Sequence, residues 1–85
     1  MVKFVVKRDG RKEDFIPEKI VVSCVKSGAD VEFAREVSRE IEKIAKEEIS
    51  SKEIKEIVFK KFEEKNPDWK RNWILYDKAV KKRYE

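Results

Sequence analysis

Positively charged side chains gather near the start of the chain, around a predicted turn and the beginning of a predicted helix. They are Lys7, Arg8, Arg11, Lys12 and Lys19. Asp9 and Gly10 form a typical hairpin turn, because glycine adopts the positive φ that such turns require. Pro17 suits the first position of a helix, and Lys19 would then lie in its first turn, at the positive end of the helix dipole. Cations placed beside a helix N-terminus are suited to hold a polyphosphate.

The overall charge composition also allows a plainer interpretation of these cations. The chain has 22 lysine and arginine residues against 18 aspartate and glutamate residues, and a formal net charge of +4. Cations and anions are interspersed, as expected for a solvated surface with ion pairs along its helices. In this interpretation the cations near the turn are simply exposed to solvent.

Composition limits the class of protein and its chemistry. The 85 residues suffice for one small domain over 1–85, and the absence of His, Gln and Thr is typical of proteins adapted to heat. A single cysteine favours a cytoplasmic location, and no apolar run reaches the roughly 20 residues of a membrane helix. Without histidine, Cys24 forms neither an ordinary zinc site nor a Cys–His nucleophile. We therefore expect no catalytic or metal-ligating residue, no enzyme activity and no membrane contact.

The apolar pattern predicts both strands and helices. Residues 2–8 alternate as a strand, with Val2, Phe4 and Val6 on one face. A return strand over 12–15 would complete a hairpin, and 47–50 leave room for a very short third strand. Four helices are expected, over residues 17–27, 30–45, 50–66 and 67–84. The result is an α+β fold in which a small β-hairpin or three-stranded sheet caps a four-helix bundle.

Spacings of three and four residues place the apolar side chains of each helix on one face. On the first helix, Ile20 and Cys24 are expected to point inward, with Val21 and Val25 as further candidates. On the second helix, the expected inward residues are Phe33, Ala34, Val37, Ile41, Ile44 and Ala45. In the last helix, Trp69, Trp73 and Tyr76 are candidates for a base-stacking platform, but their spacing favours packing in the core.

One stretch of the chain resembles a known family signature. Val-x-Lys-Arg-x-Gly-x-x-Glu-x-Phe-x-x-x-Lys-Ile, from Val5 to Ile20, is similar to the opening motif of the ATP-cone. Ser-Lys-Glu-Ile at 51–54 and Trp69, Arg71 and Tyr76 in the last helix also fit that pattern. The resemblance implies a free-standing regulatory domain related to those of ribonucleotide reductases and of the repressor of reductase genes. Such domains bind ATP or dATP and switch oligomeric state.

The resemblance also implies which residues would contact phosphate and base. Lys7 and Arg8 match a basic pair directed at the phosphates, and Lys19 matches a helix lysine with the same role. Each is a charge-assisted donor of the kind that a triphosphate needs. Val5 lies on the strand whose backbone would contact the adenine edge.

Three further positions match the family in the helices. Ser51 corresponds to a hydroxyl beside the nucleotide, although it is equally suited to cap a helix, with Ser50 as the alternative cap. Lys55 takes the place of a side chain near the base, or is an exposed helix cation. Arg83, or its neighbour Lys82, matches a terminal cation that reaches the phosphates.

Two residues before the first helix have open roles. Glu13 is a candidate for contact with ribose or Mg²⁺, but a cross-strand ion pair with Lys7 or Arg8 is favoured. Ile16 departs from the family pattern, because Asp or Asn is usual there. The change removes a side-chain cap of the helix and a polar contact with the ligand.

We therefore expect a regulatory domain that binds an adenine nucleotide, ATP or dATP, with Mg²⁺ as a candidate companion ion. The resemblance implies a ribonucleotide reductase or a transcriptional regulator as partner. Apolar residues off the inward stripes, Phe59, Ile74 and Leu75, favour a homo-oligomer. The alternative is a small basic helical module that binds nucleic acid or a protein. Nucleic acid is disfavoured because glutamates interrupt the cations of the second helix.

Overall fold

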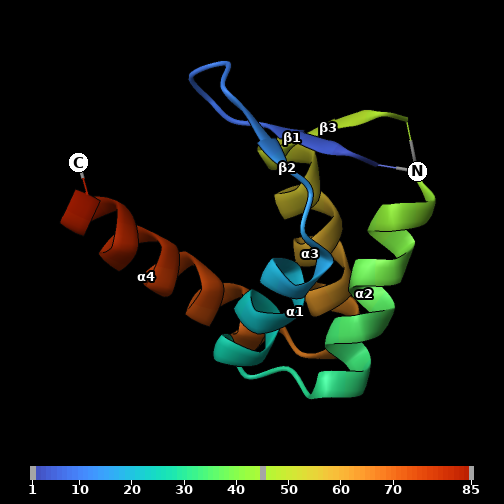
Figure 1. Cartoon of the computed structure of the whole chain (residues 1–85). Helices are drawn as coiled ribbons and strands as arrows, with labels where there is room; N and C mark the ends of the chain where they lie inside the picture. The colour runs from blue at the N-terminus through green and yellow to red at the C-terminus, as the bar shows by residue number, and fades with distance from the viewer. Residues whose placement is uncertain (1, 45, 85) are drawn as a thin grey trace.

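The computed structural model describes the backbone of residues 2–44 and 46–84 and the side chains of these residues except 77 and 79–84. The strands are β1 (Phe4–Val6), β2 (Lys12–Asp14) and β3 (Glu48–Ser50), and the helices are α1 (Pro17–Lys26), α2 (Val31–Lys43), α3 (Ser51–Lys65) and α4 (Pro67–Tyr84). The sheet lies across one end of the helices, and α4 runs outward from the others (Figure 1). The predicted α+β fold, with three strands and four helices in the described part of the chain, is confirmed.

The sheet has the strand order β2-β1-β3, so β1 lies in the middle. β1 and β2 are antiparallel, with Val5 opposite Glu13. β1 and β3 are parallel, with Val5 opposite Ile49. Because parallel strands run in the same direction, β1 and β3 end at the same edge of the sheet. The hairpin turn and the start of α3 both follow from that edge.

The two faces of the sheet have different surroundings. Val5 packs against the core and Ile49 is part of it, so their face is the one directed at the helices. Phe4 and Val6 point to the opposite face, because successive side chains of a strand alternate, and they are half-buried. Val2 lies before the strand and is buried.

Side-chain caps fix the starts of two helices. The Asp30 carboxylate accepts a hydrogen bond from the backbone N–H of Phe33 (2.8 Å), which begins α2. The Ser50 hydroxyl accepts one from the N–H of Glu53 (3.0 Å), so Ser50 is the cap and Ser51 the first residue of α3. α1 has no such bond, because its N-cap is Ile16 and Pro17 follows.

The core is aliphatic around α1 and α2 and aromatic between α3 and α4. Phe62 is fully buried and meets the rings of Trp69 and Trp73 edge-on, with centroids 5.8 and 6.1 Å away. Core packing is therefore confirmed for both tryptophans. For Tyr76 it is wrong, because that ring is 43% exposed and its hydroxyl accepts a hydrogen bond from Lys26 (2.9 Å).

Two other inward predictions are wrong. Val25 and Ile44 are 39% and 53% exposed. Val25 lies one turn beyond the buried Val21, at the edge of the face that α1 turns to its neighbours. Ile44 follows the last residue of α2 as its C-cap, beyond the part of the helix that packs. Ile20, Val21 and Cys24 are buried as expected. Ala45 lies outside the described residues.

Gly28 allows α4 to approach α1 closely. Its φ is 112°, and a Cβ atom there would lie 2.9 Å from Trp69 Cδ1. The Asn72 side chain donates a hydrogen bond to the carbonyl of Ser27 beside it (2.8 Å). The start of α4 is thus joined to the end of α1. No helix in the described part of the chain combines the length and the apolar character needed to cross a membrane.

Candidate functional site

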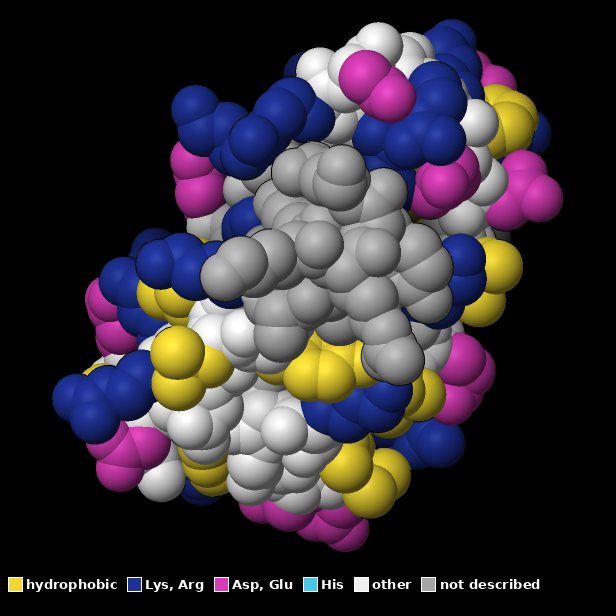
Figure 2. Space-filling view, turned by 90° about the vertical axis from the view of Figure 1, so that its left-hand side faces the viewer, with side chains coloured by type: hydrophobic (Ala, Val, Ile, Leu, Met, Phe, Trp, Pro, Cys, Tyr) yellow, Lys and Arg dark blue, Asp and Glu magenta, His cyan; other side chains and the backbone are white. Residues whose placement is uncertain are grey.

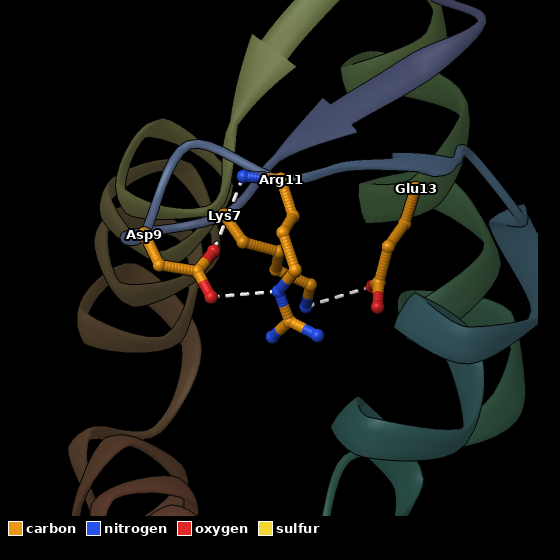
Figure 3. A network of polar contacts seen from close by, with 4 residues as sticks. All are labelled: Lys7, Asp9, Arg11 and Glu13. Atoms are coloured by element: carbon orange, nitrogen blue, oxygen red, sulfur yellow. Dashed lines mark hydrogen bonds and ion pairs between the residues drawn. The ribbon is translucent and has the colours of Figure 1, made fainter.

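The helix-facing side of the hairpin carries charged residues beyond the end of the core. Lys7 follows Val5 by two positions and shares its face, and Glu13 is the residue opposite Val5. Lys7 Nζ lies 3.4 Å from Glu13 Oε2, which confirms the cross-strand ion pair. Both side chains extend from the hairpin toward the side where α1 begins (Figure 3). A cation at this position lies close to the polar start of a helix.

The hairpin turn holds a second cation on this side. One Asp9 oxygen accepts a hydrogen bond from the backbone N–H of Arg11 (3.1 Å), and the other accepts one from Arg11 Nε (2.6 Å). The backbone bond, and then the guanidinium, hold the pKa of Asp9 below its usual range. Figure 3 shows the Arg11 side chain reaching to the same side as Lys7, with its two terminal nitrogens at the far end.

Lys12 lies on the opposite face of the sheet. Lys12 lies opposite Val6 in the pairing of β1 with β2. The Val6 side chain points away from the face that Val5 occupies, because successive side chains of a strand alternate. Its ammonium group forms an ion pair with Glu48 of β3, across the middle strand. The hydrogen bond to that carboxylate raises the pKa of Lys12. The sheet therefore separates cations that the sequence places in one cluster.

The remaining predicted phosphate ligands are exposed. Arg8 lies in the turn, and Lys19 lies in the first turn of α1, where its backbone N–H bonds to the carbonyl of Ile16 (3.1 Å). Lys19 also borders a shallow, open hollow on the surface of α1, with Glu18, Val22 and Ser23. Lys19 is therefore accessible to a ligand. It follows Glu13 by six residues in the chain.

The start of α3 supplies the second helix terminus near the hairpin. Val6 pairs with Ser50, so the end of β1 lies beside the residue that caps α3. Because Ser50 serves as the cap, the hydroxyl of Ser51 is not needed for that role. Lys55 lies one turn further along α3 and is half-buried. The parallel pairing of β1 with β3 therefore brings Lys7 and Ser51 to the same edge of the sheet.

The predicted roles of Val5 and of Arg83, or its alternative Lys82, concern residues outside this group. Val5 lies in the central strand, with a neighbouring strand on each side of its backbone, and its predicted contact with adenine stays a prediction. The side chains of Arg83 and Lys82 lie outside the described residues.

The surface around the sheet is of mixed charge. Figure 2 shows Lys and Arg side chains at the upper end of one face, where Figure 1 places the sheet, with Asp and Glu side chains among them. A separate hollow of about 150 Å³ lies between α2 and α3. Its charged lining has three carboxylates against two lysines, and one of the lysines, Lys61, already pairs with Glu40, so the hollow suits a polyphosphate poorly. The hairpin end of the molecule is the better candidate.

The residue that the sequence underrated is Arg11. Its charge places it among the cations near the turn, but the family resemblance gives it no role in the site. The signal was the Asp-Gly-Arg spacing, in which an aspartate can bond the backbone two residues later. The side-chain contact that accompanies this bond depends on the hairpin geometry.

Comparison with known proteins identifies the family of the chain. A family model described as the ATP cone domain matches residues 3–82. The matched range includes the hairpin, the starts of α1 and α3, and most of α4. No match was found among curated proteins.

Proposed function

Since the chain belongs to the ATP-cone family, we propose that it is a nucleotide-sensing domain whose phosphate site lies at the helix-facing side of the β-hairpin. ATP-cone domains are regulatory rather than catalytic and bind ATP or dATP as their ligand. The observation that carries the proposal is the family match over the hairpin and helices, together with the position of Lys7 at their junction.

In the proposed site, three cations contact the phosphates. Lys7 acts from the end of β1, Arg8 from the turn and Lys19 from the start of α1. A nucleoside triphosphate carries up to about four negative charges, so several donors from different elements are needed to balance it. The N–H groups at the start of α1 add to the attraction through the helix dipole.

Residues at the start of α3 contact the rest of the nucleotide in this proposal. The Ser51 hydroxyl lies beside the ligand, and Lys55 lies near the base. Val5 contributes through its strand and Arg83 through the end of α4. These four roles come from the family resemblance.

The ion pair between Lys7 and Glu13 does not prevent phosphate binding. Their side chains are 40% and 43% exposed, and exposed pairs of this kind contribute at most about 1 kcal/mol. A phosphate group offers Lys7 a stronger, doubly charged partner. Glu13 then either stays near Lys7 or turns to the ribose or to a bound Mg²⁺.

The regulatory output that we propose is a change of association. Leu75 is 60% exposed on α4, and Val22 and Val25 are 46% and 39% exposed on α1. Such apolar side chains are available for contact with a second copy or with a partner such as a ribonucleotide reductase or a transcriptional regulator. Nucleotide shifts the equilibrium if it contacts the free and associated states differently.

A thermal-shift titration with ATP tests the proposal. A ligand that binds only the folded state adds about 2.7 kcal/mol to the free energy of unfolding at a hundredfold excess over Kd. We expect the melting temperature to rise with ATP and dATP, in mild denaturant if the domain melts too high to measure. An unchanged transition at millimolar ATP would contradict the proposal.

A further inference from the structure

We propose that Arg11 is a further phosphate-binding residue and that Asp9 holds its guanidinium group in position. The inference rests on the proposed nucleotide site, to which it adds one cation and one positioning residue.

A single carboxylate fixes both the backbone and the side chain of Arg11. Asp9 accepts from the backbone N–H at 3.1 Å and from Nε at 2.6 Å. An arginine side chain normally loses considerable rotamer freedom when it binds a ligand. Here the bond to Nε restricts that freedom before any ligand arrives, and such preorganisation favours binding.

The direction of the side chain suits a ligand at the proposed site. Arg11 extends to the helix-facing side of the hairpin, as Lys7 does (Figure 3). The bond to Asp9 uses Nε and leaves the two terminal nitrogens outside it. Their planar arrangement matches two oxygens of one phosphate group, whereas an ammonium group acts as a point charge.

The adjacent residue provides a matched control. Lys12 has the same charge and lies in the same hairpin, but its ladder position puts it on the opposite face, where it pairs with Glu48. If only the overall positive charge of the hairpin attracted the phosphates, loss of Arg11 or of Lys12 would lower ATP affinity equally. A specific contact depends on Arg11 alone.

The experiment compares binding of ATP and AMP by isothermal titration for wild type, Arg11→Ala and Lys12→Ala. We expect Arg11→Ala to weaken ATP binding by about tenfold or more, as for the loss of a hydrogen bond to a charged group. AMP binding should fall less, because fewer phosphates are present. Lys12→Ala should bind ATP within about twofold of wild type, since the Lys12 side chain lies on the opposite face of the sheet and pairs with Glu48. Equal losses in the two variants would overturn the inference.

The role of Asp9 is tested by a double-mutant cycle. Asp9→Asn retains an oxygen that can accept from the backbone N–H of Arg11, but it loses the charge that holds Nε. We expect Asp9→Asn to weaken ATP binding in the wild-type background and to have no effect in Arg11→Ala. A loss of the same size in both backgrounds would show that Asp9 acts only through the turn, and would overturn its positioning role.

The outcomes separate this inference from the proposed function. If wild type does not bind ATP, both fail. If wild type binds and Arg11→Ala binds equally well, only the role of Arg11 fails. Melting curves of the variants without nucleotide show whether the hairpin substitutions have left the fold intact.

Discussion

Lys7 and Lys12 lie near each other in the chain but have different environments. Lys7 shares the helix-facing side of the hairpin with the core residue Val5 and meets Glu13, whereas Lys12 pairs with Glu48 on the other face. Their charge is the same, so only the direction of the side chain distinguishes them. At the scale of residues, we therefore expect phosphate binding to depend on the face that a cation occupies.

The proposed phosphate ligands can be tested one at a time. Lys7→Ala, Arg8→Ala and Lys19→Ala should each lower ATP affinity about ten- to a hundredfold, because a hydrogen bond to a charged group contributes about 1.5–3 kcal/mol. Each should melt close to wild type, since Arg8 and Lys19 are exposed and Lys7 loses only a partly exposed ion pair. Isothermal titration measures the affinities.

Two exposed lysines far from the hairpin are the controls for these variants. Lys43→Ala and Lys60→Ala, on α2 and α3, should leave ATP affinity nearly unchanged. Equal losses in all five variants would indicate diffuse electrostatic attraction and would contradict a specific site.

Cys24 should be unreactive in the folded protein. It is fully buried, and burial raises the pKa of its thiol to about 12. The unfolded chain ionises this thiol near pH 9, while the folded protein keeps it protonated, so stability falls as the pH rises above 9. The contribution is about 1.4 kcal/mol per pH unit. Denaturant unfolding at pH 8 to 11 should show that the free energy of unfolding falls more steeply with pH for wild type than for Cys24→Ala. Rapid labelling of the folded protein by a thiol reagent would contradict the burial of Cys24.

At the scale of elements, the helices differ in how they begin. Asp30 and Ser50 cap α2 and α3 with side-chain oxygens, but Ile16 at the start of α1 is 44% exposed and offers none. Pro17 compensates in part, because it has no N–H group to satisfy. A polar side chain at position 16 would therefore be able to stabilise α1 by capping it.

We expect Ile16→Asp to stabilise the fold by about 0.5–2 kcal/mol, the usual contribution of an N-cap. Denaturant unfolding without nucleotide is the measurement. Ile16→Ala is the control, since it removes the exposed apolar side chain without adding a cap, and it should be nearly neutral. A stabilisation of equal size in both variants would show that removal of the isoleucine, and no new hydrogen bond, is responsible.

The sequence predicted the elements well because their signals are local. The Asp9-Gly10 turn, the Asp30 cap and the Ser50 cap each depend on residues only two or three positions apart. The pairing of β1 with β3 joins residues more than 40 positions apart, and only a possible short strand was foreseen there.

Which face of an element points inward was harder to predict. Val25, Ile44 and Tyr76 have helical spacing that suits a core, but all three are exposed. Helical spacing shows which residues share a face of a helix, and it does not show which part of that face a neighbouring element covers. The same limit applies to the site. The positions of the cations near the turn are evident from the sequence, whereas their separation onto the two faces of the sheet depends on the register of the hairpin.

At the scale of the whole molecule, apolar surface remains on α1 and α4. The prediction that Phe59 would be left over is wrong, because it packs against the core and meets Trp73 edge-on. Ile74 is half-buried, and Leu75 is the exposed member of that set. Among the described residues, Leu75 on α4 and Val22 and Val25 on α1 are the exposed apolar side chains that we propose for association.

We expect sedimentation velocity to show a dimer or larger species whose population changes with ATP or dATP. Leu75→Lys should reduce that association, since a charge at an apolar contact must be desolvated. Glu36→Gln, which makes the same change of net charge at an exposed position of α2, controls for altered charge. A single monomeric species with and without nucleotide, at tens of micromolar protein, would contradict self-association. Any regulatory effect of the nucleotide would then have to act through contacts with another chain.

Isothermal titration of the wild-type protein with ATP, dATP and GTP tests the central claim most directly. We expect saturable binding of ATP or dATP and clearly weaker binding of GTP, because the family to which the chain belongs recognises adenine nucleotides. No saturable heat with ATP or dATP up to millimolar concentration, or equal affinity for GTP, would contradict it.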